Sequence, residues 1–211
     1  MAKDGARAAK AAARAGRKAA QPQAAPEPAL TRRTALQGRA AGRPRVTLVP
    51  APPAQRLSLR APRDGVAALS QALGLDLPVS PGTSAVSGSR AALWLGPDEW
   101  LVIEQGTAAL ASALSSTLAG VEAFHSAVDV SHRNVAILVE GAGAEAALAA
   151  GCPRDLSAPA FAVGACARTV LGKAEIVVWR TSEAAFRGEC WRSFGDYVFS
   201  FLAEAARDAE A

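Results

Sequence analysis

The sequence predicts an α+β fold made of duplicated β-α-β-β-β-α units, with mixed or antiparallel sheets that are covered by helices. Segments with strand-type alternation are interspersed with segments that carry apolar residues at helical spacing, and neighbouring strand segments are joined by turn-forming Gly and Pro. Residues 57–78 and 137–157 also share one order of strand, turn, helix and closing Asp-Leu pair. A repeated order of this kind is typical of an internal duplication.

The first unit is expected to contain a strand, a helix, a hairpin and a second helix, at residues 55–61, 64–75, 90–104 and 107–118. Asp64 and Thr107 are candidate N-caps for the two helices. Gly96, Pro97 and Asp98 separate two apolar runs, which is a hairpin signal.

The second unit repeats this order, with a strand, a helix, three strands and a closing helix at residues 134–141, 142–151, 163–171, 173–180, 184–191 and 193–207. Gly151 can end its first helix. The closing helix is amphipathic, and its inward face is expected to hold Phe194, Val198, Phe201 and Leu202.

The charge of the chain is divided between two parts. The formal net charge is +4, but residues 1–45 hold eleven Lys or Arg against two acids, so the remainder is mildly acidic. We therefore expect residues 1–42 to be a basic, Ala/Pro-rich disordered extension and residues 43–211 to be a single domain. A weak nucleic-acid or membrane arm and a transit-like peptide are the alternatives for the extension, which lacks the apolar stretch of a secretory signal.

The cysteines and histidines do not predict a metal site. Cys152, Cys166 and Cys190 are widely spaced and odd in number, so free thiols, buried or half-buried, in a reducing cytoplasm are expected. The two histidines, His125 and His132, are isolated from them in sequence. We predict no catalytic, cofactor-binding or metal-binding residue in this chain.

Residues 128–133 (VDVSHR) contain the residue types of a serine-hydrolase triad, Asp129, Ser131 and His132. Successive side chains on a strand point to opposite faces, so Ser131 and His132 would diverge and could not form the nucleophile–base hydrogen bond. A Gly-x-Ser-x-Gly elbow is absent from the sequence. This segment therefore predicts a turn between two strands rather than a catalytic site.

In that turn, Val128 and Val130 are expected to face the core. Asp129 can bind nearby backbone and pair with Arg133, because short polar side chains commonly tie turns in this way. His132 would then be a polar neighbour at an interface.

The aromatic residues are concentrated in the last 35 residues or so, where several lie beside arginines. Trp, Tyr and Arg are the residues that protein interfaces enrich, and residues that only cover the sheet are the alternative. We select as candidate subunit-interface residues Arg187, Trp191, Arg192, Phe194 and Tyr197, with Trp100 and His132 as weaker choices.

Five stretches together resemble the gamma subunit of heterotetrameric sarcosine oxidase: LGPDEWLVI, VDVSHRNVAILVEG, AAGCPRDL, VLGKAEIVVWR and FRGECWRSFGDYVFSFL. The resemblance covers roughly residues 43–206. That family is in turn similar to the folate-binding aminomethyltransferases, which implies an aminomethyltransferase-like domain.

Those enzymes carry paired aspartates where this chain has Gly172 to Val177, with Glu175 as the only acid nearby. The resemblance thus implies that the fold is kept and the folate chemistry is lost.

The resemblance implies a non-catalytic, structural or assembly subunit of a cytoplasmic enzyme complex. The holoenzyme would demethylate sarcosine oxidatively to glycine and transfer the one-carbon unit to tetrahydrofolate or release it as formaldehyde. FAD, FMN, NAD and tetrahydrofolate would lie on other subunits, and the partners would be the larger alpha and beta and the small delta subunits, without nucleic acid or membrane. The alternative is an autonomous folate-binding enzyme that uses Glu175 or Asp129. Whether the chain itself is an enzyme is left open, and no catalysis is expected from it in isolation.

Overall fold

The computed structural model describes residues 34–106 and 113–209. Its strands are β1 (Ala41–Gly42), β2 (Thr47–Pro50), β3 (Ala54–Arg60), β4 (Ser84–Ser87), β5 (Arg90–Gly96), β6 (Glu99–Gln105), β7 (Ser126–Asp129), β8 (Asn134–Glu140), β9 (Cys166–Leu171), β10 (Ala174–Ser182) and β11 (Ala185–Trp191). Its helices are α2 (Val66–Leu73), α3 (Ala113–Leu118), α4 (Ala144–Ala149) and α5 (Gly195–Asp208), with short 3-10 turns η1 (Arg63–Gly65) and η3 (Arg192–Phe194).

The described strands form two sheets, and their pairings are antiparallel. The first sheet has the order β4-β5-β6-β3-β7, and the second has the order β1-β2-β8-β11-β10-β9. The predicted duplication is confirmed, because β3-α2-β4-β5-β6-α3 is repeated as β8-α4-β9-β10-β11-α5, with matching strand order in the sheets. Of the two predicted sheet types, the structure has the antiparallel one.

The two units exchange one strand each. Strand β2 precedes β3 in the chain but pairs with β8 of the other unit, and β7 precedes β8 but pairs with β3. The first sheet therefore lacks its edge strand β7, and the second sheet lacks β2 and the edge strand β1 that pairs with β2, unless the other half of the chain supplies them. This exchange joins the two units into one folded body.

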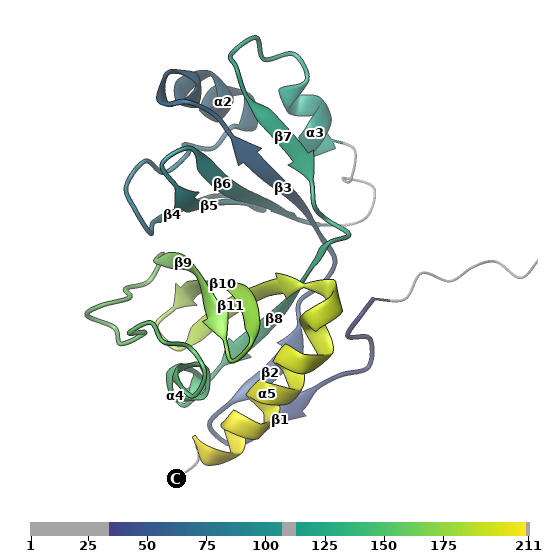
Figure 1. Ribbon diagram of the computed structural model, residues 1–211, viewed down its shortest axis with the longest axis vertical. Coiled ribbons are helices and arrows are strands. Elements are labelled where there is room, and N and C mark those ends of the chain that lie inside the picture. The colour runs from purple at the N-terminus through teal and green to yellow at the C-terminus, as the bar shows by residue number, and fades with distance from the viewer. Residues whose placement is uncertain (1–33, 107–112, 210–211) are drawn as a thin grey trace, which may run out of the picture. The chain divides into compact units, whose positions relative to one another are not determined.

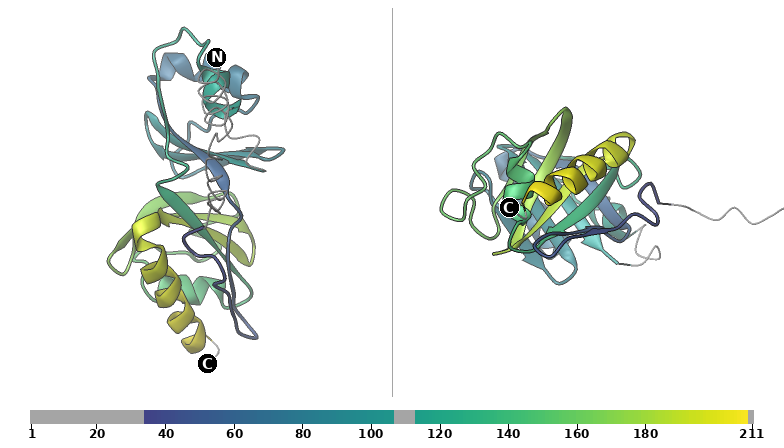
Figure 2. Two further views of the ribbon diagram at one scale, coloured as in Figure 1. Left: turned by 90° about the vertical axis from the view of Figure 1, so that its right-hand side faces the viewer. Right: turned by 90° about the horizontal axis from the view of Figure 1, so that it is seen from below.

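Each sheet buries both of its faces. Helices α2 and α3 cover one face of the first sheet through a cluster that includes Leu59, Leu69 and Leu118, and α4 and α5 cover the second sheet in the same way (Figure 1). The view from below in Figure 2 shows α5 lying across the strands that it covers. A third apolar cluster, which includes Leu101 and Trp179, is contributed by both sheets and lies between them. Burial on both faces explains the continuous apolar runs of β5, β6 and β10.

Most local predictions are confirmed, including the hairpin β5–β6 and the strands of the second unit. The capping role of Asp64 is wrong: α2 begins after η1, and Gly65 occupies its N-cap position without a side-chain hydrogen bond. Thr107 lies outside the described residues. In α5, Val198 and Leu202 are buried as expected and Phe201 is partly buried against the same core. Phe194 lies in η3 and is exposed, and Phe199 is buried instead.

The folded domain begins before residue 43. Strand β1 comprises Ala41 and Gly42, and Leu36 is buried in the core of the second sheet. Leu36 packs there beside Gly195 at the start of α5, and Arg39 forms an ion pair with Asp196 at 2.6 Å. The expected disordered extension otherwise lies outside the described residues.

Candidate subunit interface

The segment 128–133 comprises the end of β7 and the turn that leads into β8. Asp129 Oδ1 accepts a hydrogen bond from the Ser131 N–H at 2.8 Å, and Ser131 Oγ accepts one from the Arg56 N–H at 2.9 Å. Burial raises the pKa of Asp129, but the hydrogen bonds from Ser131 outweigh that effect and lower its pKa overall. Both polar side chains thus bind backbone, as the sequence indicated. Val130 is buried, whereas the expectation for Val128 is wrong because its side chain is exposed.

The turn lies directly beside the end of β11. The Arg192 N–H donates to the Arg133 carbonyl oxygen at 2.6 Å, and the Arg133 guanidinium lies over the Trp191 ring, 5.5 Å from its centroid. Arg133 therefore makes this cation–π contact, where the sequence had suggested a pairing with Asp129. The packing brings Arg133, which follows His132, into contact with Trp191 and Arg192, although about sixty residues separate Arg133 from them in sequence.

Three exposed aromatic side chains lie next to this turn, at the end of β11, in η3 and in the first turn of α5. Trp191, Phe194 and Tyr197 are 44%, 40% and 38% exposed, and the first two rings are 6.5 Å apart. Tyr197 Oη accepts a hydrogen bond from the Lys173 N–H at 3.1 Å, which fixes the phenol against the β9–β10 turn. We call the set His132, Arg133, Trp191, Arg192, Phe194 and Tyr197 the aromatic–basic surface.

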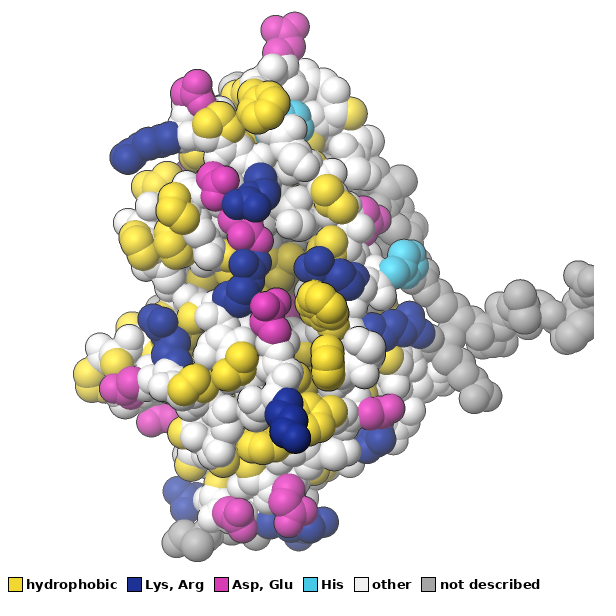
Figure 3. All heavy atoms as spheres, viewed as in Figure 1, with side chains coloured by type: hydrophobic (Ala, Val, Ile, Leu, Met, Phe, Trp, Pro, Cys, Tyr) yellow, Lys and Arg dark blue, Asp and Glu magenta, His cyan; other side chains and the backbone are white. Residues whose placement is uncertain are grey.

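The charges beside this surface are mainly positive. Arg133, Arg192 and Lys173 are exposed, with Glu175 as an exposed acid on the neighbouring strand. Asp196 is already paired with Arg39. Figure 3 shows hydrophobic side chains lying among Lys and Arg side chains on the face that it draws. Such a surface is complementary to a partner that presents apolar and acidic groups.

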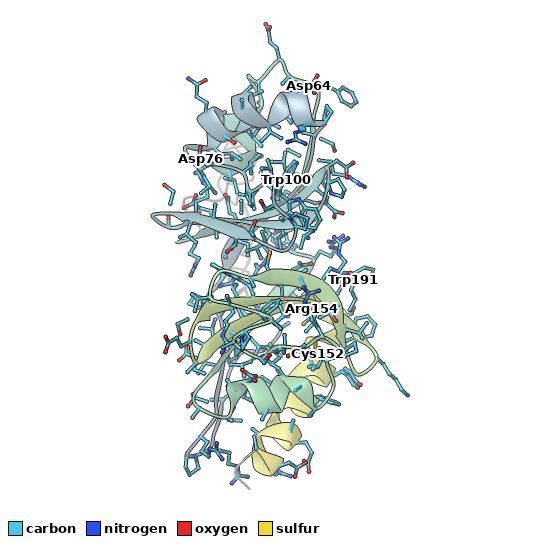
Figure 4. All side chains as sticks on the ribbon, turned by 90° about the vertical axis from the view of Figure 1, so that its left-hand side faces the viewer. Asp64, Asp76, Trp100, Cys152, Arg154 and Trp191 are labelled. Atoms are coloured by element: carbon cyan, nitrogen blue, oxygen red, sulfur yellow. The ribbon has the colours of Figure 1, made fainter. Side chains whose placement is uncertain are left out.

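Two of the seven selected residues lie inside the chain. Trp100 is 1% exposed, and its indole N–H donates to the Pro78 carbonyl oxygen at 2.7 Å. Figure 4 shows Trp100 between its sheet and the covering helices, while Trp191 lies at the margin of the second sheet. Arg187 is 3% exposed, because its side chain points into the layer between the sheets. Neither side chain can touch a partner directly, so both are removed from the proposed surface.

Arg187 belongs to a buried ion cluster that sequence reasoning missed. Glu189 Oε1 accepts from Arg187 Nε at 2.9 Å, and Glu189 Oε2 accepts from Arg56 Nε at 2.6 Å. Arg56 lies on β3 and Glu189 on β11, so the carboxylate connects the two sheets. A second pair between the sheets, Arg168 with Glu99 at 2.5 Å, is partly exposed. The alternation Arg-x-Glu within an apolar strand was the available signal, since residues i and i+2 share a face.

Two hollows are found among the described residues, and the smaller one lies between the sheets. A pocket of about 30 Å³ is lined there by residues such as Glu99, Arg168, Glu175 and Trp191, which is room for only a water molecule or two. A larger hollow of about 700 Å³ lies between α2 and the edge strand β4, with Asp76 as its one charged lining residue. Within the described ranges, no group of three or more His, Cys, Asp or Glu could hold a metal ion.

All three cysteines are buried free thiols, as expected from their spacing. Burial raises the pKa of Cys166 to about 11, and burial together with the neighbouring Glu189 carboxylate raises the pKa of Cys190 to about 12. Neither thiol is therefore activated as a nucleophile at neutral pH. In the part of the chain that the structure describes, no helix is long and apolar enough to cross a membrane.

Comparison with known proteins agrees with the resemblance seen in the sequence. The model of the sarcosine oxidase, gamma subunit family matches residues 61–208. Sarcosine oxidase subunit gamma from Corynebacterium sp. (strain U-96) is 35% identical over 149 residues, covering 70% of this chain and 71% of that protein. The corresponding subunit from Corynebacterium sp. (strain P-1) is 34% identical over 142 residues, covering 67% and 69%.

Two solved structures have folds similar to that of this chain. A chain of the heterotetrameric sarcosine oxidase from Corynebacterium sp. U-96, in complex with pyrrole 2-carboxylate, matches with a TM-score of 0.75 and 30% identity, covering 85% of this chain and 97% of that chain. The glycine cleavage system aminomethyltransferase T from Bartonella henselae matches with a TM-score of 0.55 and 17% identity, covering 75% and 45%, which shows a shared fold alone. With its family model, its relatives and its fold in agreement, the chain belongs to the sarcosine oxidase gamma subunit family.

Proposed function

We propose that this chain is a non-catalytic, structural subunit of a heterotetrameric sarcosine oxidase. In this proposal the complex demethylates sarcosine oxidatively to glycine, and the one-carbon unit passes to tetrahydrofolate or leaves as formaldehyde. The observation that carries the proposal is the aromatic–basic surface, with three aromatic side chains 38% to 44% exposed beside arginines. Exposed aromatics next to Arg are the usual anchors of a protein interface.

FAD, FMN, NAD and tetrahydrofolate are assigned by this proposal to the other subunits, which we take to be the larger alpha and beta and the small delta subunits. The two hollows described above support this assignment. The pocket of about 30 Å³ is far below the 300 Å³ or more of typical cofactor pockets, and the larger hollow between α2 and β4 is lined by no Lys or Arg that could bind the phosphates of FAD, FMN or NAD. We place the complex in the cytoplasm, and the three free cysteines support a reducing compartment.

The proposed docking energy comes mainly from Trp191 and Phe194. Full burial of a large apolar side chain contributes about 1.5–3 kcal/mol, and aromatic hot spots at the centre of an interface cost about 2 kcal/mol or more when truncated. Arg133 already lies over the Trp191 ring, so part of the surface is ordered before a partner binds. Such ordering lowers the entropy cost of association.

The test is reconstitution of the complex with Trp191→Ala and Phe194→Ala, singly and together. We expect the double variant to bind the remaining subunits at least ~30-fold more weakly, which corresponds to about 2 kcal/mol. Phe124→Ala is the matched control. Phe124 is an 84% exposed aromatic residue in the segment between α3 and β7, next to the first sheet, and it is not part of the aromatic–basic surface. Circular dichroism of each isolated variant verifies its folding.

Equal binding by the double variant and the wild-type chain would remove the aromatic–basic surface from the interface. Sarcosine oxidation by the other subunits at full rate without this chain would contradict a required structural role. Oxidase activity of the isolated chain would contradict its non-catalytic role.

A folate-binding enzyme is the second candidate function. The observation in its favour is Glu175, an exposed carboxylate on β10 that lines the small pocket between the sheets. Calorimetric titration of the isolated chain with tetrahydrofolate tests this alternative. Binding that is lost in Glu175→Gln would favour it, and we expect no binding in either protein.

A further inference from the structure

The ion cluster between the sheets carries an excess positive charge. Arg56 and Arg187 have side chains that are 3% exposed, and the one carboxylate between them, Glu189, is 1% exposed. Arginine stays protonated in proteins, so this cluster has two cations and one anion. An uncompensated charge in a buried site is strongly unfavourable, which makes a further negative charge at this place stabilising.

Two hydrogen-bond donors beside the cluster lack acceptors within the described part of the chain. They are Arg187 Nη2, which lies 2.8 Å from Glu189 Oε1 without the alignment of a hydrogen bond, and the indole Nε1 of Trp179. Trp179 and Arg187 are direct neighbours in the β10–β11 register, so their side chains lie on the same face of the sheet. That face is the one that contributes Trp179 and Val177 to the cluster between the sheets.

We propose that Trp179 Nε1 and Arg187 Nη2 bind one small monovalent anion, of the size and charge of chloride, between the two sheets. One negative charge neutralises the cluster of Arg56, Arg187 and Glu189, and the two N–H groups supply the hydrogen bonds that a buried anion needs. A water molecule could accept from both donors but would leave the charge uncompensated.

The size of the ligand follows from burial. Trp179 is 6% exposed and Arg187 is 3% exposed, so a side chain of another protein cannot reach both donors without opening the layer between the sheets. The site goes beyond the proposed function, because it lies in the interior of this chain rather than on its aromatic–basic surface. Since Arg56 is on β3 and Arg187 on β11, anion binding is expected to strengthen the contact between the sheets.

Bromide titration of the full-length chain tests the site, because bromide quenches tryptophan fluorescence and resembles chloride. The titration uses a Trp191→Phe background to remove the most exposed tryptophan, and potassium gluconate holds the ionic strength constant. We expect a saturable quenching component that chloride reverses by competition. In the added variant Arg187→Met, Trp179 still fluoresces and Arg56 and Glu189 form a neutral pair, so the saturable component should disappear.

A thermal melt provides the second measurement. The Trp191→Phe chain is expected to melt at a higher temperature in chloride than in gluconate at equal ionic strength, and Trp179→Phe is expected to reduce that difference. Strictly linear quenching, a saturable component that survives Arg187→Met, or equal melting in both salts would overturn the proposal. Competition by acetate as strong as that by chloride would overturn the assigned size of the ligand.

Discussion

The buried position of Glu189 predicts a large loss of stability when its charge is removed. Glu189→Gln keeps the shape of the side chain but leaves Arg56 and Arg187 without a counter-charge in a layer where all three side chains are 3% exposed or less. Breaking a buried ion pair on one side costs about 3–5 kcal/mol. For a chain of this size, about 1 kcal/mol corresponds to about 2–4 °C in Tm, so the expected decrease is about 6–20 °C.

The assay is urea unfolding of the full-length chain at fixed chloride concentration, followed by far-ultraviolet circular dichroism. A shift of the midpoint at constant slope reports a change in the free energy of unfolding. Glu204→Gln is the matched control, because its ion pair with Arg207 is also 2.6 Å long but both side chains are more than half exposed. Exposed pairs of this kind are worth about 0–1 kcal/mol, so the control should unfold close to the wild type.

A triple variant distinguishes the effect of the buried charges on stability from the effect of side-chain packing. Replacement of Arg56, Arg187 and Glu189 together by Met, Met and Leu removes the buried charges, and apolar replacement of a complete buried ion cluster is often neutral or stabilising. We therefore expect this protein to be more stable than Glu189→Gln. A cost below about 1 kcal/mol for Glu189→Gln, or a triple variant that is less stable than the single one, would refute the reasoning.

Two further predictions concern a turn and the buried thiols. Gly172 has φ +58°, and an added Cβ would contact the Tyr197 hydroxyl, so Gly172→Ala is expected to cost about 1–2 kcal/mol in urea unfolding. Part of that cost is assigned to the positive φ and part to the contact with the hydroxyl. If Gly172→Ala cost no stability in a Tyr197→Phe background, the part assigned to the backbone would be contradicted. Burial raises the pKa of Cys166 to about 11, so from about pH 9 to about pH 11 the unfolded thiol ionises while the folded one keeps its proton, and stability falls as pH rises. Cys166→Ala should make the fall in urea midpoint between pH 8 and pH 10.5 shallower, and an unchanged slope would contradict the assignment.

The local elements were predictable because each has a periodic pattern. Residues 55–61 alternate as a strand does, and the hairpin β5–β6 is marked by Gly96 and its neighbours. The strand exchange was not predictable in the same way. A strand was predicted at β7 but not at β2. The strands that receive them, β3 and β8, hold equivalent places in the two sheets, so the sequence does not reveal which sheet receives either strand.

The site was predictable only in part, because exposure depends on the position within a strand. Trp100 and Trp191 both lie on strands, but Trp100 faces the covering helices beside Leu59, whereas Trp191 is the last residue of β11 and remains half-exposed. Arg187 was selected for the interface because it lies beside aromatic residues in the sequence, and protein interfaces enrich Arg and aromatic residues. Its partner Glu189 lies two residues further on the same strand, which allows both charges to be buried together.

The packing between the two sheets also explains why a partner protein is expected at the outer surface, and why the interior has room for a small ion but not for a ligand of cofactor size. In a pair of sheets that face each other, the layer between them is where a ligand would contact both units. Here that layer is occupied by the apolar cluster around Leu101 and Trp179 and by the ion pairs Arg56–Glu189 and Arg168–Glu99, beside a pocket of about 30 Å³. A ligand of cofactor size could enter only if these contacts between the sheets were broken. The half-exposed aromatic rings at the end of β11 require no such rearrangement, so they are the groups from which we expect assembly to begin.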